Sequence, residues 1–383
     1  MSEPNDHDRG AAGVRGRRWR NWAGDQSCEP RSLERPATTA QLCACVERAA
    51  GQGERVRVVG SGHSFSDIAC TDGVMLSLEH MTRVLDVDRS SGLVRVQADP
   101  ELWRAARVGL GSLGAIAEVT LRCVPAFTLH GVDAPAPLEE ALSRFEELAL
   151  ANDHFEFFVF PHAQVALTRT NNRTERPPRP PSRLSAYATD VLLTNRAFEL
   201  FCRAGRRFPS QIPRLNRIVT ALAGRRERVD RSAAIFASPR LVRFSEMEYA
   251  VPRSAVPTAV RRVLELIEQR GFAVPFPIEV RAVAADDALL STAHGRESGF
   301  VAVHMYRGME WEPYFRAVEA VMDELDGRPH WGKRHFQTAA TLRGRYPEWD
   351  RFQSVRARLD PQGRFANRWT DRVLGRVGAL SRS

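Results

Sequence analysis

A short run of small residues around one histidine is the first feature of the sequence that could bind a ligand or take part in a reaction. A valine-rich strand is predicted over residues 56–59, and the run Gly-Ser-Gly-His-Ser over residues 60–64 follows it directly. Successive backbone N–H groups in such a turn form a concavity that holds anions such as pyrophosphate. The ring of His63 is also a nucleophile that can bond to an electrophilic cofactor carbon. A turn histidine satisfied by backbone carbonyls is the competing interpretation, and the residues alone leave both open.

Two charged side chains share one face of a predicted strand further along the chain. Glu279 and Arg281 alternate in the strand expected over residues 277–284. Opposite charges on an apolar strand are costly unless they are paired or face a wet cavity. A binding face and a structural ion pair therefore both remain open.

Lys333 is the single lysine of the chain, since 54 of the 55 basic residues are arginine. It lies in the run His-Trp-Gly-Lys-Arg-His over residues 330–335. Lysine is a compact point charge on a flexible stem, whereas arginine is a planar fork. That difference favours a site that the fork does not fit over an incidental surface lysine.

Several other chemistries find no support in the sequence. Residues 109–114 fit GxGxxG, but a helix is predicted before them and a strand after them, which reverses the dinucleotide-binding order. His330 and His335 have no carboxylate cluster beside them, and no HExxH occurs, so we expect no metal site. No GxSxG elbow indicates a serine hydrolase. The glycines of residues 109–114 are interpreted as a tight turn with backbone close to a ligand.

The elements that must position these residues fall into two groups. The first has a helix opened by the capping box at residues 38–41, strands at 56–59 and 75–78, and a hairpin over 84–98. A helix over 102–108 and an alternating strand over 116–124 complete it, so the first domain should end near Pro125. The second group alternates long helices with isolated strands, which predicts an α+β domain with an antiparallel sheet. Its expected helices are 138–150, 183–204, 213–223, 254–270 and 311–325, and its expected strands are 155–160, 165–170, 241–250, 277–284 and 300–307.

Composition limits the partners and the location. The net charge is +9 and the pI about 9.8, but the arginines are spread along the chain, so a basic nucleic-acid-binding protein is the less favoured alternative. The sequence has no apolar stretch of about 18 residues and no apolar signal core near its start, so we expect a cytoplasmic protein without an integral membrane segment. Peripheral membrane contact and oligomeric state stay open. Six scattered cysteines without a CxxC pair indicate free thiols.

Several segments resemble one enzyme family. RVRVVGSGHSFSDIACTDGVMLSL is similar to the flavin-attachment segment of the D-arabinono- and L-gulono-1,4-lactone oxidases and dehydrogenases, which are vanillyl-alcohol-oxidase-type flavoproteins. RVGLGSLGAIAEVTLRCVPAF resembles the end of their FAD domain. FPIEVRAVAADDALLSTAHGR and GRPHWGKRHFQTAATLRGRYPEWDRF resemble their substrate domain. The match runs from about residue 21 to residue 375.

The resemblance implies an FAD-dependent oxidation of a sugar lactone, with oxygen or another acceptor taking the electrons. His63 would carry the flavin covalently, and Glu279 and Arg281 would face the lactone hydroxyls, with Lys333 near the flavin ring. The FAD pyrophosphate and adenosine would be held by Val59, Gly60, Ser61, Gly62, Ser64, Gly114 and Ile116. The implied organisation is a basic extension over 1–22, a vanillyl-alcohol-oxidase-type FAD-binding domain over 23–124, and an α+β substrate domain over 125–383 whose residues 330–371 return to the flavin site.

One departure from the family leaves two outcomes open. Family members carry a long stretch of FAD domain, with a second glycine- and threonine-rich loop, where this chain joins Asp99 directly to Pro100. The FAD-binding domain is therefore truncated. Either His63 and the remaining domain still hold FAD, or the chain is an internally deleted, non-catalytic remnant.

Overall fold

The chain divides into two units, each with its own packing. Our computed structural model describes residues 18–82, 100–119, 123–182, 184, 195–237 and 240–378, and the hairpin expected over 84–98 lies outside them. Unit 1 contains Met1–Val124, Ala288–Ser291 and Gln337–Ser383, and unit 2 contains Pro125–Asp287 and Thr292–Phe336. Every interaction described below lies within one of these units.

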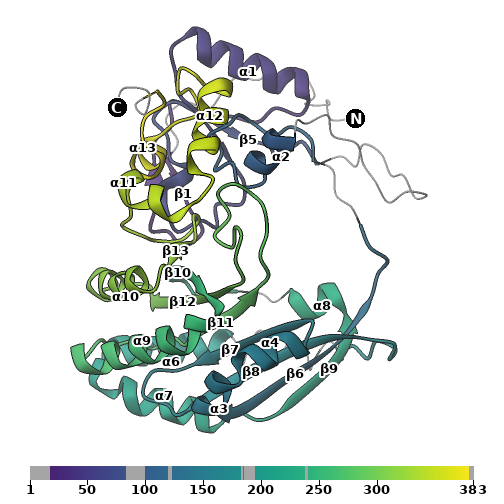
Figure 1. Cartoon of the computed structure of the whole chain (residues 1–383), viewed down its shortest axis with the longest axis vertical. Helices are drawn as coiled ribbons and strands as arrows, with labels where there is room; N and C mark the ends of the chain where they lie inside the picture. The colour runs from purple at the N-terminus through teal and green to yellow at the C-terminus, as the bar shows by residue number, and fades with distance from the viewer. Residues whose placement is uncertain are drawn as a thin grey trace, which may run out of the picture. The chain divides into compact units, whose positions relative to one another are not determined.

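Unit 1 is a small parallel sheet with helices from both ends of the chain. The sheet has the order β3-β5-β4, all strands parallel, and β1 and β2 form a separate antiparallel pair. Its elements are β1 (Trp19–Arg20), β2 (Ser27–Cys28), β3 (Ser32–Glu34), α1 (Thr39–Gly51), β4 (Val56–Val59), η1 (Asp67–Ala69), β5 (Val74–Ser77), α2 (Pro100–Ala106), α11 (Ala339–Leu342), η5 (Arg343–Arg345), α12 (Trp349–Leu359) and α13 (Arg368–Leu374). Figure 1 shows α1, α2, α12 and α13 around this sheet.

Helix α1 begins as its sequence predicts. The Thr38 hydroxyl accepts a hydrogen bond from the Gln41 backbone N–H at 3.2 Å, which satisfies a donor that the first turn leaves open. The Gln41 side chain in turn accepts from the Ala37 N–H at 2.8 Å. Leu42, Cys45 and Ala49 lie on the buried face of α1 and pack against the strands β4 and β5. The helix start predicted at residues 38–41 is confirmed, but the return bond of a capping box reaches the N–H of Ala37 rather than that of Thr38.

The strand predicted over residues 116–124 is wrong. In the described parts of this segment, 116–119 and 123–124, the backbone forms no strand, and Ile116, Val119 and Val124 are exposed. Ala115 and Ala117 do pack on the core of unit 1, but Val119, which the predicted alternation places on the same side, is exposed. Alternation becomes a strand only where a neighbour supplies a hydrogen-bonded ladder, and the described residues pair none with this segment.

Unit 2 is built on an eight-stranded sheet with the order β13-β10-β12-β11-β7-β8-β6-β9. Neighbouring strands are antiparallel throughout, so the expected α+β class with an antiparallel sheet is confirmed. The strands β7, β8 and β6 lie side by side in Figure 1. The strands are β6 (Thr128–Pro137), β7 (His154–Val159), β8 (Val165–Thr174), β9 (Arg226–Arg231), β10 (Phe244–Pro252), β11 (Ile278–Val283), β12 (Ser298–Tyr306) and β13 (Arg328–Pro329).

One face of this sheet is apolar and carries the main core of unit 2. Alternate residues such as Met247, Val280 and Val303 are at most 1% exposed and pack in one cluster with helical residues such as Val260 and Phe315. Because side chains alternate across a strand, the intervening residues point to the other face. The helices of the unit are α3 (Leu138–Ser143), α4 (Phe145–Ala151), α6 (Phe198–Arg207), α7 (Ile212–Ala221), α8 (Ser232–Phe236), α9 (Val256–Arg270) and α10 (Glu312–Glu324), with short 3-10 turns η3 (Pro209–Gln211) and η4 (Arg253–Ala255).

Among the elements of unit 2 that differ from the sequence expectation are a divided helix and a strand that contains prolines. The helix predicted over 138–150 is divided at Arg144 into α3 and α4, which pack on different strands of the twisted sheet. Strand β6 was not predicted, since glycine and two prolines interrupt its sequence. Both prolines, Pro135 and Pro137, lie beyond the last pair with β9, at Asp133, where β6 has an open edge. An open edge tolerates a residue without an N–H donor.

Among the described residues, no helix has the length and apolar character needed to cross a membrane.

Candidate functional site

The run predicted to hold an anion forms a loop at the end of β4, which we call the glycine–serine loop (Gly60–Ser66). The β1–β2 hairpin segment holds it in place from one side. The Trp22 N–H donates to the Gly62 carbonyl at 2.7 Å, and the Asn21 amide donates to the Ser64 carbonyl at 2.9 Å. These bonds fix the loop through its carbonyl oxygens, which leaves its N–H groups to face elsewhere.

His63 lies at the exposed surface of this loop. Its ring stacks on the Trp22 indole, with 5.3 Å between ring centroids and 18° between planes. Gly62 has a φ of 69°, and an added Cβ would stand 3.1 Å from the Trp19 ring, so the turn requires glycine here. The turn is thus shaped to present the next residue, His63, with one ring face supported and the edge accessible.

The loop fits a bound phosphate group on its own residues. No hydrogen bond from the backbone N–H groups of Ser61, Gly62, His63 or Ser64 occurs within the described parts of the chain. Gly60 has open space where a Cβ would stand, so a ligand can approach its backbone closely. Unpaired, adjacent N–H groups on a small-residue turn are the arrangement that binds phosphate oxygens.

The second glycine-rich run, residues 109–114, uses carbonyl oxygens as acceptors, whereas the glycine–serine loop offers N–H donors. Arg57 of β4 is 2% exposed, and its guanidinium donates to the carbonyls of Leu110 at 3.1 Å, Gly111 at 3.0 Å and Phe365 at 2.7 Å. Burial lowers the pKa of Arg57 to about 10, so it stays charged at neutral pH. Residues 109–114 therefore turn acceptors inward to a buried cation. The interpretation of this run as a turn rather than a dinucleotide fingerprint agrees with that geometry.

Gly114 and Ile116, the two residues expected near the adenosine, are accessible in unit 1. Gly114 has a φ of 134° with open space at the Cβ position, and Ile116 is 55% exposed. Val59, by contrast, is buried in the sheet as the last residue of β4 and precedes the loop directly. Its backbone, not its side chain, leads into the turn.

The second candidate region is the polar face of the sheet in unit 2, opposite the apolar core. Register places Glu279 of β11 beside Ala302 of β12, and Glu248 of β10 beside the same Ala302. Two residues away on the same pair of strands, Glu246 of β10 is paired in register with His304 of β12. Carboxylates of two strands thus lie on either side of a small residue, on one face.

Lys333 and Arg281 join these carboxylates into one network, which we call the charged cluster (Glu246, Glu248, Glu279, Arg281, Lys333). The Lys333 Nζ lies 2.5 Å from a Glu246 oxygen and 3.0 Å from a Glu248 oxygen. Arg281 pairs with Glu248 and, at 3.3 Å, with Glu279. The three predicted catalytic residues, Glu279, Arg281 and Lys333, are therefore brought together through Glu248, whose side chain is completely buried.

Mutual charge neutralisation sets the protonation states of the cluster. Burial raises the pKa of the Glu246 carboxyl, but nearby His304 and Lys333 outweigh it and hold this pKa well below its ordinary value. Burial acts likewise on Glu248, where Lys333 and Arg281 lower the pKa. Burial lowers the pKa of Lys333, yet the two carboxylates leave it above its ordinary value. All three groups are charged at neutral pH.

Sequence reasoning missed Glu246, Glu248 and His304. The two glutamates alternate around Met247 in the same way that Glu279 and Arg281 alternate around Val280. The rule that found the β11 pair could therefore have found the β10 pair. His304 gave no such signal, because its role depends on its partners. Its Nδ1 lies 3.1 Å from the Pro277 carbonyl oxygen and its Nε2 lies 3.3 Å from Glu246.

The polar face continues across β7, β8 and β6. Arg169 pairs with Glu156 at 3.1 Å and with Asp133 at 2.6 Å, and its guanidinium lies 5.6 Å from the centre of the Phe158 ring. Burial raises the pKa of Glu156. The nearby Arg169 charge offsets this rise only in part, so the pKa stays above its ordinary value. Six strands thus present paired charges on one surface, which suits a ligand rich in hydroxyl groups.

In the described residues, no group of three or more His, Cys, Asp or Glu side chains is arranged to hold a metal ion. Within the described residues, none of the six cysteines forms a disulfide.

Comparison with known proteins gives consistent matches. A family model described as D-arabinono-1,4-lactone oxidase matches residues 119–373, and one described as an FAD binding domain matches residues 30–108. L-gulono-1,4-lactone dehydrogenase of Mycobacterium tuberculosis is 45% identical over 93% of this chain and 99% of the relative. L-gulonolactone oxidase of Bos taurus is 28% identical over 94% and 99%, respectively. A variant of cholesterol oxidase from Brevibacterium sterolicum has a similar fold, with a TM-score of 0.77 at 12% identity over 98% of this chain and 99% of that one.

The alignment with the mycobacterial relative extends over 424 positions, more than the 383 residues of this chain. It therefore includes positions of the relative that have no counterpart here.

Proposed function

Because the chain belongs to the D-arabinono-1,4-lactone oxidase family and is thereby an FAD-linked sugar-lactone oxidoreductase, we propose that it oxidises a 1,4-lactone of the D-arabinono or L-gulono type. In this proposal unit 1 holds the cofactor and the polar face of unit 2 holds the lactone. The family model's description supports the D-arabinono type, and the relatives' names support the L-gulono type and both an oxidase and a dehydrogenase.

The glycine–serine loop is the single observation that carries the cofactor proposal. The N–H groups of residues 61–64, which have no partner among the described residues, bind the FAD pyrophosphate, and an exposed imidazole edge lets His63 carry the flavin covalently. The Trp22 ring fixes the imidazole orientation, so the bonding nitrogen is held in one direction. When bound, FAD supplies the acceptor for the hydride of the lactone.

The charged cluster is proposed to bind and orient the lactone. Glu279 is 8% exposed and accepts hydrogen bonds from lactone hydroxyls, while Arg281 is 38% exposed in its side chain and donates to ring or hydroxyl oxygens. Several paired charges around a polyol give orientation, because each hydroxyl meets a fixed partner. Ion pairs within the cluster hold the two side chains in place before the ligand arrives.

Lys333 is proposed to stabilise negative charge that develops during the oxidation. Its Nζ already contacts two carboxylates, which neutralise much of its charge locally. The lysine therefore acts together with Glu246 and Glu248 as a unit rather than as an isolated cation. A point charge with three donors suits two carboxylates and one further acceptor.

The test is the absorption spectrum of the purified full chain. We expect a yellow protein whose colour stays with the precipitate after acid denaturation, and a His63→Ala variant whose colour does not. His80→Ala is the matched control, since His80 is an exposed loop histidine of the same unit. Flavin retained covalently by His63→Ala contradicts the attachment proposal.

Substrate and acceptor are tested on the same preparation. We expect bleaching of the flavin band without air on adding L-gulono-1,4-lactone or D-arabinono-1,4-lactone. Return of the band on admitting air indicates an oxidase, and return only with an added acceptor indicates a dehydrogenase. No bleaching with either lactone contradicts the substrate proposal.

A non-catalytic remnant is the second candidate, favoured by the alignment positions that this chain lacks. Missing loop donors weaken a charged pyrophosphate site, because each charge-assisted hydrogen bond contributes about 1.5–3 kcal/mol. A colourless preparation that takes up no FAD on incubation supports the remnant. A coloured preparation excludes it.

A further inference from the structure

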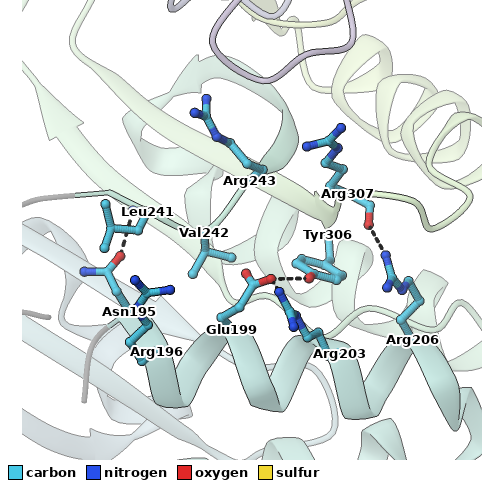
Figure 2. A pocket seen from close by; sticks show the side chains of 10 residues that line it. All are labelled: Asn195, Arg196, Glu199, Arg203, Arg206, Leu241, Val242, Arg243, Tyr306 and Arg307. Carbon is cyan, nitrogen blue, oxygen red and sulfur yellow. Dashed lines mark hydrogen bonds and ion pairs between the residues drawn. The ribbon is translucent and has the colours of Figure 1, made fainter. Parts of the chain in front are cut away.

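A pocket in unit 2 is lined largely by arginine and has no place in the proposed lactone oxidation. It encloses about 570 Å³, between α6, the segment before β10, and the end of β12 (Figure 2). Its lining residues are Asn195, Arg196, Glu199, Arg203, Arg206, Leu241, Val242, Arg243, Tyr306 and Arg307. We call it the arginine pocket.

The arginines come from two different parts of the chain. Arg196, Arg203 and Arg206 follow the helical spacing of one face, and Figure 2 shows them along the helix. Arg243 and Arg307 lie at the ends of neighbouring strands, where the Arg307 N–H donates to the Arg243 carbonyl at 3.1 Å. Pairing of β10 with β12 thus brings two arginines to the pocket that are 64 positions apart in sequence.

The single acidic residue of the lining does not balance this charge. Five arginines and one glutamate leave a formal excess of four positive charges. Glu199 is already engaged, since it pairs with Arg203 at 2.9 Å and accepts from the Tyr306 hydroxyl at 2.6 Å. Arg196 and Arg307 have no side-chain partner in the described parts of the chain. A concentration of like charge in a concave site attracts anions.

The chemistry and the size of the pocket select the anion. Guanidinium groups match phosphate oxygens with two parallel hydrogen bonds, which favours phosphate over a monovalent ion. The volume lies within the usual range for small-molecule sites, about 300–1,000 Å³, and exceeds what one phosphate fills. Tyr306, whose ring is 5.4 Å from the Arg206 guanidinium, adds an aromatic wall.

We propose that the arginine pocket binds a small molecule with two or more linked phosphate groups. The phosphates occupy the space between the α6 arginines and the strand-end arginines, and both sets donate to them. The source is free pyrophosphate or a nucleoside diphosphate, which share this chemistry. All lining residues of the arginine pocket belong to unit 2, whereas the glycine–serine loop belongs to unit 1.

Titration calorimetry of the full chain with sodium pyrophosphate, and separately with ADP, tests the proposal. We expect saturable binding of pyrophosphate that weakens as salt is raised. Arg196→Gln and Arg307→Gln should each weaken it about tenfold, since each removes one charge-assisted contact worth roughly 1.5 kcal/mol. Neither change strands a partner inside the fold. Tighter binding of ADP assigns the site to a nucleotide, and equal or weaker binding assigns it to pyrophosphate; either supports the proposal.

Arg214→Gln is the matched control. Arg214 is an exposed arginine on α7 outside the pocket, so the charge change is the same and the affinity should not move. Equal weakening by Arg214→Gln would reduce the effect to net charge and overturn the proposal. Absence of binding at millimolar pyrophosphate, or loss of flavin from the pocket variants, would overturn it as well.

Discussion

The two candidate regions of this molecule build polar sites in different ways. The glycine–serine loop of unit 1 offers backbone N–H groups and one side chain, His63, on a turn that glycine permits. The charged cluster of unit 2 offers paired side chains from neighbouring strands and, with Lys333, from the loop after β13, and its three glutamates are buried. A backbone site depends on the shape of the turn, whereas a side-chain site depends on every charge having its partner. The two should therefore respond differently to substitution.

Lys333→Met should produce the largest loss of stability, because it leaves Glu246 and Glu248 buried without their shared cation. Breaking a buried pair by removing one partner costs about 3–5 kcal/mol. Urea unfolding of the variant measures the loss, and lactone-dependent flavin reduction should fall with it. Arg316→Met is the control, since its pair with Glu312 on α10 is exposed and contributes at most about 1 kcal/mol. A loss no larger than that of the control would show that the cluster is not held by its charges.

Arg57→Met tests a buried charge of unit 1. Its guanidinium serves three carbonyl oxygens, and their loss of a donor should lower the free energy of unfolding by about 3 kcal/mol. Arg55→Met, two residues earlier and half exposed beside Asp371, should lower it by less than about 1 kcal/mol. Similar losses in both variants would contradict the importance of the turn at residues 109–114.

Gly62→Ala tests the backbone site itself. A φ of 69° costs an L-residue about 1–2 kcal/mol, and the new methyl group would press on the Trp19 ring. We expect a stability loss of that size and a larger fractional loss of bound flavin, measured by absorbance at equal protein concentration. Gly60→Ala should leave stability nearly unchanged, because its Cβ position is open. Unaltered flavin content in Gly62→Ala would mean that the turn is not shaped for the cofactor.

The pH dependence of stability should come mainly from the charged cluster. The pKa values of Glu246 and Glu248 are lowered below 4.5 in the folded state, so their contribution is complete above about pH 4.5 and is lost as the pH falls through the folded values. The pKa of Lys333 is raised above 10.5, so its contribution is present below that pH and is lost as the pH rises further. Between pH 6 and 8 the cluster therefore adds no pH dependence.

Hydrogen exchange of the backbone amides at two pH values measures the loss of stability in acid. Protection in β10 and β12 should drop between pH 7 and about pH 3 more than protection in β4 and β5. In a Glu246→Gln variant the drop should be smaller, because one titrating carboxyl is gone. An equal drop in both units would show that the acid sensitivity lies elsewhere.

Local patterns in the sequence determined the structural features that depend only on residues close together in the chain. The capping box predicted the start of α1, the run of small residues predicted a turn after β4, and alternation placed Glu279 and Arg281 on one face. Segment resemblance identified the family without any structure. The structural signals among these each lie within a few neighbouring residues, where backbone geometry and side-chain direction are set by local sterics.

Only the tertiary structure decided which partners those elements meet. Lys333 and Glu246 are 87 positions apart, and their pairing depends on where the loop after β13 crosses β10. Strand β6 exists despite two prolines because β8 supplies a ladder, whereas residues 116–119 form no strand because none is beside them in the described chain. Hydrogen-bonded ladders and buried ion pairs join distant residues, and no local pattern records a distant partner.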